Sequence, residues 1–86
     1  MHMTFYQFRL LIPRAQLLHV LTAGTYLTQR WELERGVNLY HLPGEGSGFF
    51  VEVGYNEAAF ETVVLRSFSS SVLLKDYTYG VQLPDF

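Results

Sequence analysis

The chain contains no cysteine and few charged residues among its 86 positions. The lack of cysteine excludes a disulfide framework, a thiolate nucleophile and a cysteine-based zinc site. Charged residues make up 16% of the chain, whereas an average domain has about 25%. The hydrophobic fraction is 49%, with one Trp, six Tyr and seven Phe, which predicts an ordered core rather than disorder. Because little charge is available to cover the outside, we expect apolar surface at an interface.

Basic residues are also scarce, and the net charge is -2. Nucleic-acid-binding domains usually carry a basic patch, so a nucleic-acid partner is not expected. No apolar run approaches the roughly 18 residues of a membrane-spanning helix, and no signal segment is recognised at residue 1. We therefore expect a cytoplasmic protein without a membrane partner. Met1 and His2 are interpreted as a cloning remnant, which leaves a single domain over residues 3–86.

The first part of the sequence predicts a strand followed by a helix. Within residues 4–12, aromatic and aliphatic side chains occupy alternate positions, which is typical of a strand. Pro13 suits the first position of a helix, and Gly24 suits a left-handed residue at its end. We therefore predict a short amphipathic helix over residues 13–23, with a stripe of Leu and Val that faces a sheet.

The rest of the sequence predicts mostly strands. Residues 25–35 fit a strand better than a helix, although both patterns are present. Further strands are predicted over 37–42, 49–55 and 60–68, and Ser70 or Ser71 could cap a second short helix near the C-terminus. The predicted fold class is α+β, with a mostly antiparallel sheet of four to five strands and two short helices.

The glycine-rich run 42–50, LPGEGSGFF, could be a phosphate-binding loop or a turn. A phosphate loop needs backbone N–H groups at the start of a helix and usually a Lys. This run has no Lys or Arg, its Glu45 would repel an anion, and a strand pattern follows it. We predict a hairpin turn in which glycine supplies positive φ angles. A flap over a pocket is the alternative.

The predicted hairpins assign each side chain to a face of the sheet. The simplest registers place Leu42 opposite Phe49, residue 33 opposite residue 37, and residue 55 opposite residue 60. Alternation then defines the two faces. One predicted face carries Leu27, Gln29, Trp31, Leu33, Val37, Leu39, His41, Phe50, Glu52, Val63 and Leu65. The other predicted face carries Arg30, Tyr40, Leu42, Phe49, Val51, Val53, Tyr55, Phe60, Val64 and Arg66.

Both predicted faces are largely apolar, yet two short helices can cover only one of them. We therefore predict that a second copy of the chain covers the other face, in a homodimer. The predicted interface consists of Tyr40, Phe49, Val51, Val53, Tyr55, Phe60 and Val64.

The sequence offers only weak candidates for catalysis. His41 and Glu52 are predicted to lie diagonally on one face, and a carboxylate beside an imidazole is the minimum for acid–base chemistry. A structural hydrogen bond accounts for the same pair. No recognisable nucleophile or second carboxylate accompanies them. The three His residues have no metal-ligand spacing, so we predict no metal site and no cofactor.

Two binding sites are alternatives to self-association. Arg66 with Ser69, Ser70 and Ser71 could hold a small anion such as a phosphate or carboxylate at the start of the second helix. Arg30 and Arg66 beside aromatic side chains could instead stack on single-stranded nucleic acid. The leading prediction is a non-enzymatic module for self-association or protein interaction.

Overall fold

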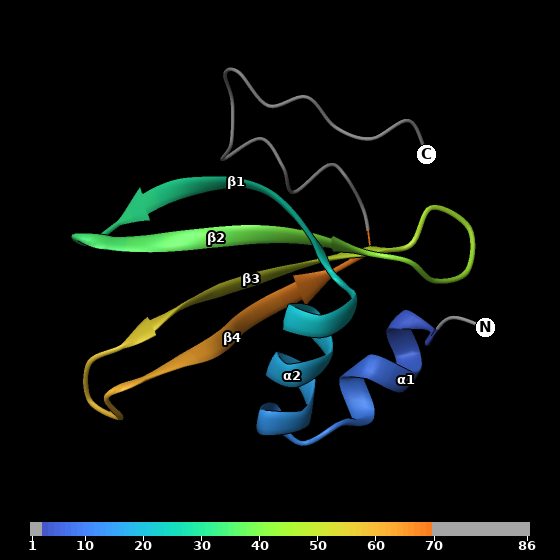
Figure 1. Cartoon of the computed structure of the whole chain (residues 1–86), viewed down its shortest axis with the longest axis horizontal. Coiled ribbons are helices and arrows are strands. Elements are labelled where there is room, and N and C mark those ends of the chain that lie inside the picture. Colours follow the sequence, from blue (N-terminus) through green and yellow to red (C-terminus); the bar gives the residue numbers. More distant parts are fainter. Residues whose placement is uncertain (1–2, 70–86) are drawn as a thin grey trace.

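The computed structural model describes residues 3–69, which form two helices and a four-stranded antiparallel sheet (Figure 1). The helices are α1 (Phe5–Leu10) and α2 (Pro13–Ala23), and both precede the sheet. The strands are β1 (Thr25–Glu32), β2 (Arg35–Leu42), β3 (Phe49–Asn56) and β4 (Glu61–Phe68), which pair in sequence order. The α+β class is thus confirmed in its broad form. The helix predicted after Ser70 or Ser71 lies outside the described residues.

The prediction of a strand over residues 4–12 is wrong, because residues 5–10 form α1. Thr4 and Gln7 make a capping box: the Thr4 hydroxyl accepts from Gln7 N at 3.0 Å, and Gln7 Oε1 accepts from Thr4 N at 2.9 Å. These bonds satisfy amide groups that a helix start otherwise leaves without partners. Thr4 and Gln7 are three residues apart, the spacing of this motif, so the sequence did contain the signal.

The predicted helix over residues 13–23 is confirmed as α2. Pro13 occupies its first turn, and because Pro disfavours a helical residue before it, Ile12 is extended and separates α1 from α2. Gly24 follows α2, but it is extended with φ -81° rather than left-handed. A Cβ at Gly24 would lie 2.5 Å from the Val20 carbonyl oxygen, so a close backbone approach, not positive φ, requires glycine here.

The main core lies between the helices and one face of the sheet. Phe8 of α1 and Val20 of α2 are fully buried there against Leu42, Phe49, Val51 and Val53. The Phe8 and Phe49 ring centroids are 5.2 Å apart. Isolated helices as short as α1 are unstable in water, so burial of Phe8 is what stabilises α1 on the sheet.

A second apolar cluster occupies the opposite face of the sheet. Leu39, Phe50 and Phe68 are buried there, with Leu27 packed against them. Phe50 and Phe68 stack with centroids 5.6 Å apart and an interplanar angle of 22°. The prediction that both sheet faces are apolar is therefore confirmed for this part of the chain.

Two of the three predicted registers are wrong. Leu42 does pair with Phe49, and residues 43–48 form the predicted turn, with positive φ at Gly46 and Gly48. However, β1 and β2 join through a two-residue turn of Leu33 and Glu34, so that residue 32 pairs with 35. On the other side, residue 56 pairs with 61 rather than residue 55 with 60.

Irregularities in β1 and β4 change which side chains share a face. Leu27 interrupts the pairing of β1 with β2, and Leu65 interrupts the pairing of β4 with β3. Each extra residue shifts the alternation by one position. The irregularity at Leu65 places Arg66 opposite Glu52. Arg30 lies between Leu27 and the turn, so the two-residue turn itself places it opposite Val37. Both arginines therefore lie on the face opposite to the one predicted.

Candidate functional site

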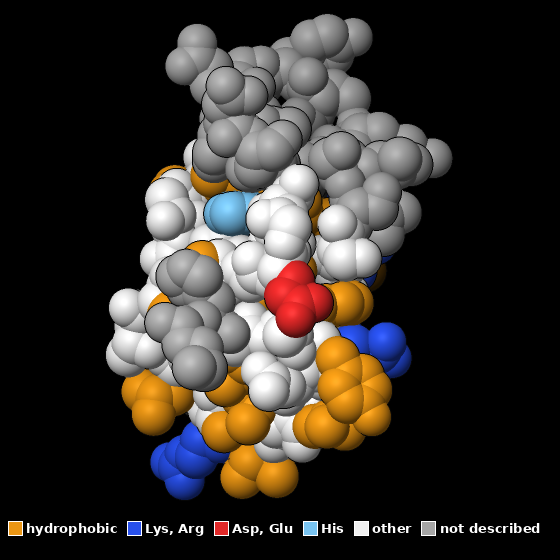
Figure 2. Space-filling model, turned by 90° about the vertical axis from the view of Figure 1, so that its right-hand side faces the viewer, with side chains coloured by type: hydrophobic (Ala, Val, Ile, Leu, Met, Phe, Trp, Pro, Cys, Tyr) orange, Lys and Arg blue, Asp and Glu red, His pale blue; other side chains and the backbone are white. Residues whose placement is uncertain are grey.

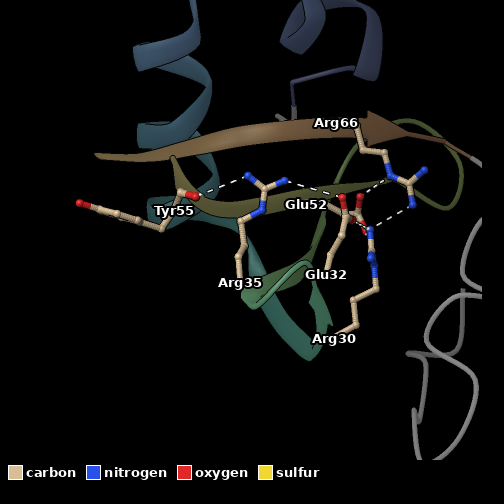
Figure 3. Close-up of polar contacts among 6 residues, drawn as sticks. All are labelled: Arg30, Glu32, Arg35, Glu52, Tyr55 and Arg66. Carbon is tan, nitrogen blue, oxygen red and sulfur yellow. Dashed lines mark hydrogen bonds and ion pairs between the residues drawn. The ribbon is translucent and has the colours of Figure 1, made fainter. Parts of the chain in front are cut away.

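A buried carboxylate lies at the centre of the sheet face that faces away from the helices. The Glu52 side chain is 1% exposed and accepts from Arg30 Nε at 3.2 Å and from Arg66 Nη2 at 3.4 Å. Arg66 Nε also contacts Glu52 Oε1. Figure 3 shows the two guanidinium groups converging on Glu52 from different strands. A carboxylate this buried requires such partners, because an uncompensated charge is very costly there.

The ionic contacts continue from Glu52 toward the β1–β2 turn (Figure 3). Arg30 Nη2 lies 2.8 Å from Glu32 Oε2, and Arg35 Nη2 lies 3.8 Å from Glu32 Oε1. Arg35 also donates to the Tyr55 carbonyl oxygen at 3.5 Å. These contacts connect all four strands through side chains. They therefore have a structural role in holding the hairpins together.

His41 and Glu52 share this face, as the alternation predicted, but each engages other groups. The His41 Nε2 atom lies 2.7 Å from the Ser47 carbonyl oxygen, and its ring lies 5.2 Å from that of Phe50. The Glu52 oxygens are engaged by guanidinium donors. These contacts are of the structural kind that the sequence offered as the alternative to acid–base chemistry. In the described part of the chain, no three His, Cys, Asp or Glu side chains are grouped as a metal site.

The described residues show Arg66 and Ser69 in different surroundings, and the anion site itself stays a prediction. Arg66 points to Glu52, and its guanidinium lies 5.5 Å from the Phe68 ring centroid. Ser69 instead lines a groove beside α1, together with Glu45. A carboxylate in that groove opposes anion binding. Ser70 and Ser71 lie outside the described residues.

Most of the predicted interface residues belong to the core of the monomer. Phe49, Val51 and Val53 are at most 2% exposed beneath the helices, and Tyr40 and Val64 pack against them. The helices therefore cover the face that was assigned to a second copy. α1 lies where a strand was expected and packs on this face beside α2. Tyr55 and Phe60 differ, with exposures of 46% and 82%.

The face predicted for nucleic-acid stacking is also divided by the observed registers. Arg30 and Arg66 lie on one side of the sheet, whereas Tyr40 and Phe49 lie on the helix side. Within residues 3–69, the ring that lies beside Arg66 is that of Phe68, which is buried. A base needs an accessible aromatic face for stacking.

Exposed apolar side chains gather at the tips of the two outer hairpins. Leu33 is 93% exposed at the β1–β2 turn, and Phe60 is 82% exposed at the β3–β4 turn. Both residues have positive φ angles, 49° and 54°, a conformation that is costly for residues other than glycine. At Leu33 the positive φ is what a two-residue hairpin turn requires, although glycine and asparagine are the residues that favour it. The sequence pattern assigned Leu33 and Phe60 to strands, so their exposure at the turns was not predicted.

Between these two tips lies a groove, and we name it the tip groove. Its walls include Leu33 and Glu34 on one side and Tyr55, Glu57 and Ala58 on the other. Its volume is about 610 Å³. Arg35 and Asn56 also line it, and Glu34 and Glu57 are exposed at its edge. The groove therefore combines a few apolar side chains with a mainly polar lining in which carboxylates outnumber the one arginine.

The corner between α1 and α2 also exposes apolar side chains, but its charged residues are basic instead of acidic. We name residues 9–14 the helical corner. Leu10 and Ile12 are 68% and 70% exposed there, and Arg9 and Arg14 are exposed beside them. Figure 2, which views the molecule from the α1 side, shows hydrophobic side chains gathered in its lower part with basic side chains at the margin. No acidic residue occurs in residues 1–31 of the sequence. The helical layer is therefore apolar and basic.

Comparison of the chain with protein-family models, curated proteins and solved structures finds no match in any of the three. Among residues 3–69, no helix is long and apolar enough to cross a membrane.

Proposed function

We propose that this chain is a small non-enzymatic module that works by self-association, as a homodimer, and that its contact surface consists of exposed apolar side chains. The observation that carries the proposal is their number: within residues 3–69, ten large hydrophobic side chains are 46–93% exposed. Single exposed hydrophobic residues are common on monomers. Here, however, several gather at the tip groove and the helical corner, and concentrated apolar surface is typical of protein contacts.

The composition supports the same proposal. Trp31 and Tyr26 of β1 are 72% and 54% exposed, and aromatic residues and Arg are enriched at protein interfaces. With only 16% charged residues, the chain has little charge on its surface to oppose contact between such side chains and a partner. Because the predicted sheet-face interface is buried in the monomer, the proposed contact moves to the outer surfaces. A cytoplasmic location and the absence of catalysis remain predictions.

The two binding alternatives receive less support from the geometry. An anion at Arg66 would compete with the buried Glu52 carboxylate, which already engages that guanidinium. Single-stranded nucleic acid would need the arginines and accessible aromatic rings on one face. Within residues 3–69, the Phe68 ring beside Arg66 is buried. We therefore retain protein self-association as the function.

The solution mass across a wide range of concentrations tests the proposal, by size exclusion with light scattering and by sedimentation equilibrium. We expect a species of twice the chain mass whose proportion rises with concentration. A single species of monomer mass throughout the range would contradict self-association. Addition of phosphate and of a single-stranded oligonucleotide in parallel samples measures the two alternatives by thermal shift.

A further inference from the structure

We infer that the dimer forms when the helical corner of one copy enters the tip groove of the other, with the contact made twice about a two-fold axis. This inference rests on the proposed self-association and names the surfaces that meet. It follows from the charges of the two surfaces, their apolar content and their positions in one molecule.

The tip groove suits a basic and apolar occupant. Leu33 and Tyr55 supply apolar walls, and Glu34 and Glu57 supply negative charge at the rim. Arg35 also lines the groove, but its guanidinium lies 3.8 Å from Glu32 and donates to the Tyr55 carbonyl oxygen. Its charge is therefore partly compensated within the molecule, and the rim carboxylates dominate the field that a partner meets.

The helical corner has the complementary chemistry. Leu10 and Ile12 present aliphatic side chains of 68% and 70% exposure, flanked by the exposed Arg9 and Arg14. Complementary charges guide association and exclude wrong orientations, while the apolar side chains supply the burial. A second copy of this chain carries both surfaces, so it is an occupant that matches each of them.

The positions of the two surfaces favour a two-fold contact. A second groove, of about 580 Å³, lies between Ile12 and Arg14 on α2's side and Glu61 and Thr62 on β4's side. The helical corner is thus a neighbour of the β3–β4 hairpin within one molecule. When two complementary surfaces lie side by side, one two-fold axis lets both contacts form at once, and such closed dimers are the commonest symmetric assembly.

Charge exchange between the two surfaces provides the test. The corner variant carries Arg9→Glu and Arg14→Glu, and the tip variant carries Glu34→Arg and Glu57→Arg. In each homodimer both contacts would place like charges together, so we expect dissociation constants at least about a hundredfold higher than for the original chain. In an equal mixture every contact pairs opposite charges, so a heterodimer should form with close to the original affinity.

Sedimentation velocity of each variant and of the mixture gives the readout, and circular dichroism confirms that each variant is folded. The control is Glu45→Arg at an exposed position of the 43–48 turn, which changes charge away from both surfaces and should leave the dimer unchanged. If both folded variants remain dimers, this interface is wrong although self-association stands. If the original chain is monomeric at every concentration, both the interface and the proposed function fail.

Two further outcomes would overturn the inference. Variants that are monomeric alone and also in the mixture would show that the two surfaces do not meet each other. Binding of the original chain to vesicles of anionic phospholipid, lost in the corner variant but kept in the tip variant, would assign the helical corner to a membrane surface instead. Recovery of the heterodimer is the result that supports the inference.

Discussion

Arg30 on β1 reaches across β2 to Glu52 on β3, with Arg30 Nε 3.2 Å from Glu52 Oε2. Glu52 is 1% exposed and Arg30 is 19% exposed. This contact spans the intervening strand, so it ties β1 to the centre of the sheet in addition to the hydrogen bonds between β1 and β2. The same carboxylate is engaged by Arg66 on β4. The cluster therefore couples the two outer strands through one buried group.

Removal of the Glu52 charge should destabilise the fold. Glu52→Gln leaves two guanidinium groups beside a neutral amide, and loss of one partner from a buried ionic contact costs about 3–5 kcal/mol. Because Arg66 is 41% exposed, water screens part of this loss, and we expect a free energy of unfolding lower by about 3 kcal/mol. Urea denaturation measures it. The control Glu45→Gln should change stability by less than about 0.5 kcal/mol, and equal values for both would exclude a structural role for the cluster.

The assignment of residues 5–10 to a helix is tested by two aromatic truncations. In the strand that the alternation predicted, Tyr6 and Phe8 would share a face and be buried alike. In α1, Phe8 is fully buried and Tyr6 is 72% exposed. We expect Phe8→Ala to lower the free energy of unfolding by about 3–5 kcal/mol, and Tyr6→Ala to change it by less than about 0.5 kcal/mol. Similar losses from both changes would support the strand.

The turn between β2 and β3 provides a matched pair of glycines. Gly46 and Gly48 both have positive φ, 63° and 78°, but a Cβ at Gly46 meets no atom within 4 Å, whereas one at Gly48 would lie 2.2 Å from the Leu42 carbonyl oxygen. Gly46→Ala should cost about 1–2 kcal/mol from backbone strain alone. Gly48→Ala should cost about 1–3 kcal/mol more because of the clash. Thermal unfolding of both variants gives the comparison, and an equal loss would contradict this turn geometry.

A change in the β1–β2 turn should raise the stability of the fold and weaken the dimer at the same time. Leu33 and Glu34 both have positive φ, so the double change Leu33→Asn and Glu34→Gly should relieve about 1–2 kcal/mol of strain. The same change removes an apolar wall and a rim charge of the tip groove, so the dimer should weaken. Stability is measured in the Arg9→Glu, Arg14→Glu background, where association does not contribute. A variant that is less stable, or that dimerises unchanged, would refute this interpretation of Leu33.

The parts of the fold that the sequence predicted share a local cause. Pro13 begins α2, the run after residue 42 turns the chain, and Leu42 pairs with Phe49. Each depends on the conformational preference of a few neighbouring residues. The helix over residues 5–10 was also signalled locally, by Thr4 and Gln7, but the apolar alternation of the same segment obscured it.

The candidate site could not be derived in the same way. Whether Arg30 faces Glu52 depends on the two-residue turn of Leu33 and Glu34, which sets the register of residues 28–32. Whether Arg66 faces Glu52 depends on the irregularity at Leu65. A change of one residue in a turn or bulge reverses every side chain beyond it. No residue type in the sequence signals the turn length or the irregularity at Leu65. The predicted faces of residues 28–32 in β1 and of the second half of β4 were therefore reversed.

The sequence by itself determined the α+β class, the positions of α2 and of the four strands, and the scarcity of charge that leaves apolar surface outside. Periodicity, proline and glycine act over a few residues, so they can be interpreted without knowledge of the fold. Only the tertiary structure decided that the helices cover the face with Val51, that Glu52 is buried between two arginines, and that basic and acidic apolar surfaces lie at separate places. These features depend on strand register and on packing between distant segments, and neither is specified by any one stretch of chain.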